Sequence, residues 1–133
     1  MKKKEIQKLK EKTLFTANDI SLLLNITPQT SYKIINELNE EMKKINKERK
    51  KEGLIEWIIF THKVYKKYFA ERYYGLDFLS YKKISENYDL KEYEVNEFCK
   101  NIKKELKQKG YKFVKGRIPK EYILQKLLIW SWW

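Results

Sequence analysis

The stretch TANDISLLLNITPQTSYKIINELNEEMKK, residues 16–44, carries the strongest structural signal in this chain. Apolar residues recur in it at helical spacing, in two runs that a short break separates. Thr16 and Asp19 have the spacing of a capping box, with Asp in place of Glu, at the start of the first run. Thr27 can cap a second helix, whose first position is Pro28, where the missing N–H costs nothing. The stretch therefore predicts two helices joined by a tight turn.

The apolar positions of these two helices predict which faces are buried. The second helix is expected to continue to about residue 52, because Gly53 is the first strong stop signal after it. Ser31 is small. When the sequence is shifted by 64 residues, it aligns with Val95, which is expected to face inward, so we assign Ser31 to packing. The predicted buried residues are Ile20, Leu23 and Leu24 in the first helix, and Ile34, Ile35, Leu38, Met42 and Ile45 in the second.

Shorter signals flank this pair of helices. Residues 2–12 are basic, with apolar residues three apart, which fits either a short helix or a frayed basic arm. Leu54–Phe60, LIEWIIF, is β-branched and aromatic and predicts a strand. Residues 64–75 then have the spacing of a closing helix that ends at a glycine.

The pattern begins again after residue 75. When the sequence is shifted by 64 residues, Thr16 aligns with Ser80 and Ile35 aligns with Cys99 without a gap. The registers then differ, and they realign at the closing helix, where residues 64–72 match residues 118–126. Apolar, capping and turn positions all match. Chance similarity between lysine-rich segments is the alternative, but it does not explain why all three kinds of position agree.

A second strand signal lies in YKFVKGRIP, residues 111–119. Two short apolar segments flank Lys115-Gly116-Arg117, which predicts a small hairpin with Gly116 in the turn. Each unit then has two helices, a hairpin and a closing helix. The expected fold is mainly α with short β-hairpin wings, a tandem winged helix-turn-helix. We expect the first unit, with its basic N-terminal helix or arm, at residues 1–75 and the second, with an aromatic tail, at residues 76–133.

Composition limits the classes of function. The 133-residue chain has a net charge of +12, which favours a polyanionic partner, although a lysine-rich genome would also inflate the charge. It contains one cysteine and one histidine, so we expect no disulfide, no Cys/His metal site and no cofactor. No apolar run is long enough to cross a membrane, and no signal peptide is evident, which predicts a cytoplasmic protein. No catalytic motif or phosphate-binding glycine loop points to an enzyme or to a small-molecule substrate.

Two strings in the first unit are familiar. L-F-T-A-x-D-I-x-x-x-L-x-I-T, residues 14–27, and Y-K-I-I-x-x-L-N-x-E, residues 32–41, resemble small helix-turn-helix proteins of Gram-positive phages and mobile elements. Those proteins are excisionase-like or repressor-like DNA binders. The resemblance implies a regulator that binds double-stranded DNA. Those proteins usually carry one unit and gain a second by pairing on DNA, whereas both units lie in one chain here.

In a helix-turn-helix, the early residues of the second helix reach the base edges in the major groove. In the first unit the exposed early positions are Gln29, Thr30, Tyr32, Lys33 and Asn36. Candidates for the DNA backbone or the wings are Lys43, Lys44, Lys63, Lys115 and Arg117. The equivalent helix of the second unit begins with Glu92, Glu94 and Glu97, so it either uses Tyr93, Asn96 and Lys100 or has diverged toward protein binding.

The last residues, LLIWSWW, carry three tryptophans, Trp130, Trp132 and Trp133. They either fold back onto the core or anchor a protein partner or a homodimer. The leading hypothesis is a sequence-specific DNA-binding regulator of a phage or mobile element. The alternative is a phage-encoded inhibitor, similar to anti-CRISPR proteins, that binds a host protein or ribonucleoprotein. RNA binding by the tyrosine-rich basic surface is a third hypothesis.

Overall fold

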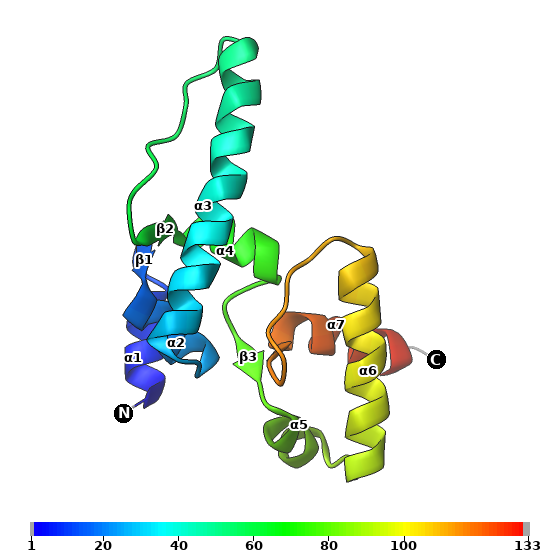
Figure 1. The fold of residues 1–133 in the computed structure, drawn as a ribbon. Helices are drawn as coiled ribbons and strands as arrows, with labels where there is room; N and C mark the ends of the chain where they lie inside the picture. The colour runs from blue at the N-terminus through cyan, green and yellow to red at the C-terminus, as the bar shows by residue number, and fades with distance from the viewer. Residues whose placement is uncertain (1, 132–133) are drawn as a thin grey trace. The chain divides into compact units, whose positions relative to one another are not determined.

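A computed structural model describes the backbone of residues 2–131 and the side chains of residues 4–128. It divides the chain into two compact units, Met1–Phe69 and Ala70–Trp133, and each is described here by itself. The described elements are mostly helices, together with two antiparallel sheets of two strands each (Figure 1). This confirms the expectation of a mainly α chain with short β elements.

The first unit begins with α1 (Lys2–Leu9), so the helical alternative for the basic N-terminal segment is confirmed. Strand β1 (Leu14–Thr16) leads into α2 (Ala17–Leu24) and then α3 (Pro28–Lys51). Strand β2 (Lys63–Tyr65) follows, and α4 (Lys66–Tyr73) continues across the division between the units. The two strands pair antiparallel, with Phe15 opposite Val64.

Local capping explains where α2 and α3 begin. The Thr16 hydroxyl accepts a hydrogen bond from the Asp19 amide at 3.3 Å, and the Asp19 carboxylate accepts one from the Thr16 amide at 2.9 Å, which confirms the capping box. Asn25 ends α2 in the left-handed conformation, with φ of 55°. Thr27 then caps α3 through its side chain, and Pro28 occupies the first turn.

The core of the first unit follows the predicted helical faces. Phe15 and Phe69 meet edge to face, with ring centroids 5.7 Å apart, and both are fully buried. Ser31 is also fully buried, as predicted, and its hydroxyl lies 2.7 Å from the Ser21 hydroxyl. Ile45 is only half-buried, whereas the other predicted core residues of α2 and α3 are buried: Ile20, Leu23, Leu24, Ile34, Ile35, Leu38 and Met42.

The predicted strand at Leu54–Phe60 is wrong. After Gly53, whose φ of 74° lets the chain reverse, residues 54–61 run back beside α3 without strand pairing. We call residues 54–61 the return segment; in Figure 1 it is the green loop beside the projecting end of α3. A β-rich sequence forms a strand only where a partner strand is available, and β1 already pairs with β2.

Side chains of α3 take the place of a partner strand. The Asn46 amide accepts from the Trp57 N–H at 2.9 Å and donates to the Trp57 carbonyl at 2.9 Å. The Asn39 amide donates to the Phe60 carbonyl at 3.0 Å and to the Lys63 carbonyl at 2.9 Å. Arg49 donates to the Ile55 carbonyl at 2.7 Å. We call the part of the first unit formed by the end of α3 and the return segment, residues 43–61, the arm.

The second unit contains the same order of elements. Strand β3 (Phe78–Leu79), α5 (Tyr81–Tyr88) and α6 (Glu92–Gln108) precede β4 (Ile118–Pro119) and α7 (Lys120–Ser131). Both ends of α5 lie 64 residues after those of α2, and α6 starts 64 residues after α3. Asp89 ends α5 with φ of 52°, as Asn25 ends α2 with φ of 55°. The alignment of the two sequences therefore predicts the helices of both units.

The predicted hairpin at residues 111–119 is only partly correct. Val114 and Arg117 form a single β-bridge around Gly116, whose φ is 77°. The following strand, β4, pairs instead with β3, with Leu79 opposite Ile118. The sequence signal identified the turn but not the partner strand, because that partner lies far earlier in the chain.

The core of the second unit is a cluster of buried side chains from α5, α6, β4 and α7. Cys99 is fully buried in it, as predicted from its alignment with Ile35, and burial raises the pKa of its thiol to about 11. Lys109, just after α6, lies 3.3 Å from the Tyr122 hydroxyl, and this hydrogen bond raises the pKa of its ammonium group. The buried members of the cluster are Ile84, Val95, Cys99, Ile102, Leu106, Ile118, Tyr122 and Ile123.

We predict that Asn46→Ala lowers the free energy of unfolding by about 1–2 kcal/mol, because both hydrogen bonds to Trp57 are lost. Asn36→Ala is the matched control, since Asn36 lies on the exposed face of the same helix. Urea denaturation of the two variants measures the difference. Equal losses in the two variants would show that the asparagine bonds do not hold the return segment.

We predict that Cys99 resists alkylation by iodoacetamide at pH 8 in the folded protein. Its pKa of about 11 keeps the thiol protonated at that pH, and only the thiolate reacts readily. Since the unfolded thiol ionises at a lower pH, labelling should become fast once urea unfolds the chain. Mass spectrometry of the labelled protein reports both rates, and rapid labelling without urea would contradict the buried placement.

Candidate nucleic-acid interface

The face of α3 opposite the core presents polar side chains. Gln29, Lys33 and Asn36 are all exposed, and their spacing of four and three residues places them on one side of the helix. Ser31 lies between Gln29 and Lys33 in the sequence but points to the opposite, buried side of the helix. Its hydroxyl contacts that of Ser21 and donates to the Thr27 carbonyl at 3.2 Å. The structure therefore brings these three predicted residues together on one exposed surface.

Two other predicted residues of α3 have additional contacts. Thr30 is exposed, but its hydroxyl lies 3.0 Å from that of Thr27 at the helix cap. Tyr32 is 42% exposed and packs edge to face on His62, with ring centroids 5.3 Å apart. His62 itself has φ of 64°. Tyr32 therefore joins the start of α3 to the end of the loop before β2, next to exposed Lys63.

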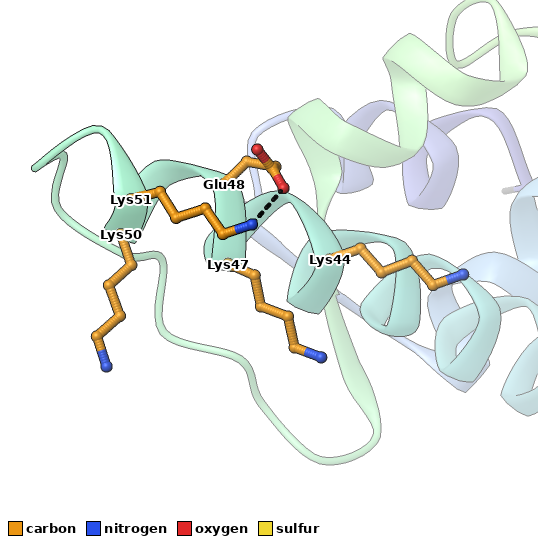
Figure 2. A pocket seen from close by; sticks show the side chains of 5 residues that line it. All are labelled: Lys44, Lys47, Glu48, Lys50 and Lys51. Carbon is orange, nitrogen blue, oxygen red and sulfur yellow. Dashed lines mark hydrogen bonds and ion pairs between the residues drawn. The ribbon is translucent and has the colours of Figure 1, made fainter.

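The exposed face of α3 continues into the arm as a row of lysines. Lys43 and Lys44 were predicted as contacts, and both are exposed, with Lys43 bound to Glu40 at 2.9 Å. Figure 2 shows Lys44 together with Lys47, Lys50 and Lys51 around one open hollow beside Glu48. Sequence reasoning missed the last three lysines, although their spacing on a helix predicted to reach residue 52 places them on the same side as Lys43 and Lys44.

The start of α3 is electrostatically suited to an anion. No acidic residue lies in its first turn, and the positive end of the helix dipole adds to the charge of Lys33. The first turn of α6, in contrast, holds Glu92 and Glu94. The Glu94 carboxylate accepts from the Lys91 amide at 3.0 Å, so it serves as a cap for its own helix.

The remaining predicted contacts belong to the second unit. Tyr93 is 69% exposed, and Asn96 and Lys100 are exposed on the same helix, so the side chains are available to a partner. Lys115 is exposed in the turn after Val114, whereas Arg117 is half-buried beside the bridge. The side chain of Trp130, and Trp132 and Trp133 as a whole, lie outside the described residues.

Other kinds of site have little support among residues 2–131. The described side chains contain no group of three or more His, Cys, Asp or Glu residues placed to hold a metal ion. No helix in the described part of the chain is both long enough and apolar enough to cross a bilayer.

No family model, no curated protein and no solved structure matches the chain.

Proposed function

We propose that this chain is a sequence-specific double-stranded DNA-binding regulator of a phage or mobile genetic element, built as a tandem winged helix-turn-helix. The observation that carries the proposal is the exposed early face of α3, where Gln29, Lys33 and Asn36 lie together without an acidic neighbour in the first turn. In this proposal α2 supports α3, and α3 enters the major groove.

The dimensions and chemistry suit that role. An α-helix with its side chains is about 10–12 Å across, close to the width of the major groove. Gln29 and Asn36 can each pair with an adenine edge, and Lys33 can donate to the acceptors of guanine. Because the buried face of α3, which includes Ser31, fixes the rotation of the helix, these side chains would meet the bases in one orientation.

The lysines of the arm supply a second kind of contact in this proposal. Lys47 lies 11 residues after Asn36, or about 16 Å further along the helix, beyond the bases that the helix start can reach. Lysines at that distance contact phosphates, which position a protein but carry no sequence information. The arm would therefore add affinity for any DNA, and its contribution would fall as salt rises.

We predict that Lys33→Ala combined with Asn36→Ala weakens specific binding by about 30-fold or more, since two base contacts contribute roughly 2 kcal/mol or more together. DNA selected from a random pool by the native chain is the probe, with a scrambled sequence for comparison. Asn101→Ala with Lys104→Ala, both exposed on α6, is the matched control. Unchanged affinity for the selected DNA in a gel-shift titration would contradict base reading by α3.

We predict a different result for Lys47→Ala, Lys50→Ala and Lys51→Ala together. Affinity for selected and scrambled DNA should fall by the same factor, because phosphate contacts do not depend on sequence. A plot of log affinity against log salt should become shallower by up to about 2.7, or 0.9 per lost phosphate contact. Lys104→Ala, Lys107→Ala and Lys120→Ala remove the same charge elsewhere and should leave the slope nearly unchanged. Loss of discrimination between the two DNAs would place these lysines among the base readers instead.

One observation favours the second candidate, an inhibitor that binds a host protein or ribonucleoprotein. The exposed start of α6 holds Glu92 and Glu97 where the first unit has Pro28 and Lys33, and carboxylates repel phosphates. Under this candidate, capture of a host partner survives nuclease treatment and is lost in Glu92→Gln with Glu97→Gln. If nuclease treatment abolishes capture of the host partner, the chain binds DNA or RNA and not a host protein directly.

A further inference from the structure

The return segment exposes large apolar side chains to solvent. Ile55 is 85% exposed and Ile58 is 69% exposed, next to Leu54 at 48% and to Trp57 and Phe60 at 36% each. Single exposed apolar residues are ordinary, but five within seven consecutive residues give the segment an apolar surface on both of its faces. A surface of that kind commonly marks a site of contact with another molecule.

The return segment is extended where α3 holds it. Asn39 and Asn46 are seven residues apart on α3, which is about 10.5 Å along the helix axis. Asn46 binds Trp57, and the first of the two carbonyls that Asn39 binds belongs to Phe60, only three residues later in the sequence. Covering that length takes about 3.5 Å per residue, which is the limit for an extended chain. The backbone here therefore has the geometry of a strand without belonging to a sheet.

The bonds to α3 leave part of this backbone unpaired. The carbonyl of Ile55 and both backbone groups of Trp57 are bound by α3 side chains. Between and beyond them, the N–H and C=O of Glu56 and the N–H of Ile58 have no hydrogen-bond partner among the described residues, whereas the Ile58 carbonyl accepts from the Tyr65 hydroxyl at 2.7 Å. These groups are available to an added strand, as at the exposed edge of a sheet.

We propose that the return segment is a docking site for an extended segment of another protein, in which apolar and acidic residues alternate, and which adds as a strand beside Glu56 and Ile58. The positive charge around the return segment is the reason to expect acidic residues in the partner. Residues 43–63 hold seven Lys or Arg residues against three Glu. Lys47, Lys50 and Lys51 are exposed on the end of α3, and Lys51 lies 3.5 Å from Glu48. In an extended segment Ile55 and Ile58, which are three residues apart, lie on opposite faces. The apolar residues of the partner would cover the apolar side chains of one face, while its carboxylates would meet the lysines.

The same features disfavour other occupants. A bilayer would have to take up Glu56 and unpaired backbone groups, which are costly in hydrocarbon. A second copy of the chain would bring an equal excess of positive charge to the same place. Duplex DNA offers no apolar surface to cover Ile55 and Ile58. The proposal does not depend on base reading by Lys33 and Asn36, so either can fail without the other, but both proposals use the lysines of the arm.

The test begins with a phage-displayed library of random nine-residue peptides, selected on the full chain at physiological salt. We expect enrichment of peptides that alternate Val, Ile or Leu with Asp or Glu. A synthetic peptide of the enriched consensus is then titrated by fluorescence anisotropy. Binding should slow amide hydrogen exchange at Glu56 and Ile58 in the native chain, since those N–H groups become hydrogen-bonded.

Variants locate the site. Ile55→Ser with Ile58→Ser should weaken peptide binding by about tenfold or more, equal to roughly 1.4 kcal/mol of lost apolar contact. Leu124→Ser with Leu128→Ser, at exposed leucines of α7, is the matched control and should change it by less than about twofold. Because Ile55 and Ile58 are exposed, the variant should unfold at the same urea concentration as the native chain.

Four results would overturn the proposal. They are failure to enrich any peptide, enrichment of basic peptides, equal binding by the two variants, and binding without slower exchange at Glu56. Self-association of the native chain that Ile55→Ser with Ile58→Ser abolishes would assign the segment to a second copy instead. Binding to phosphatidylserine vesicles that the same variant abolishes, without any peptide binding, would assign it to a membrane surface.

Discussion

The packing of α2 against α3 is the constraint on which the first unit depends. The turn at Asn25 sets the direction of α3, and its buried apolar face sets its rotation, together with the contact between the hydroxyls of buried Ser31 and half-buried Ser21. Once α3 has one rotation, three consequences follow: the side of Ile35 and Leu38 is buried, the side of Lys33 and Asn36 is exposed, and the asparagines that hold the return segment lie between those sides. The packing of α3 against α2 thus determines the position of every proposed contact surface on this helix.

Local signals in the sequence were sufficient for the helices. The capping box at Thr16, the cap at Thr27 and the apolar spacing of both helices act over a few residues, so they are visible in a short window. The repeat also predicted the bounds of α5 and the start of α6, because the residues that cap these helices lie 64 positions after those of α2 and α3. Burial of Ser31 and Cys99 was predicted from the same alignment.

Long-range pairing was not visible in the sequence. LIEWIIF has the composition of a strand, but whether it becomes one depends on which partner the fold places beside it. Nothing in residues 54–60 indicates that amide side chains from Asn39 and Asn46 would take the partner's place. The strand β4 shows the converse, since Ile118 pairs with Leu79 from the start of the unit and not with the adjacent hairpin. Lys47, Lys50 and Lys51 were not among the predicted contacts, although a helix that reaches about residue 52 places them on the exposed side that carries Lys43 and Lys44.

The two units share an order of elements but not a length. From Pro28 to Glu92 the offset is 64 residues, whereas from Val64 to Ile118 it is 54, so the first unit is ten residues longer from the start of its second helix to its second strand. Seven of the ten lie in the helix itself, because α3 has 24 residues and α6 has 17. The arm accommodates that difference, and the second unit forms its own core without one. The arm is therefore an insertion into a repeated scaffold, and shortening such a connection changes the entropy of loop closure only slightly. The sequence of the arm can accordingly vary during evolution separately from that of the scaffold, because the exposed side chains of the arm are not part of the core.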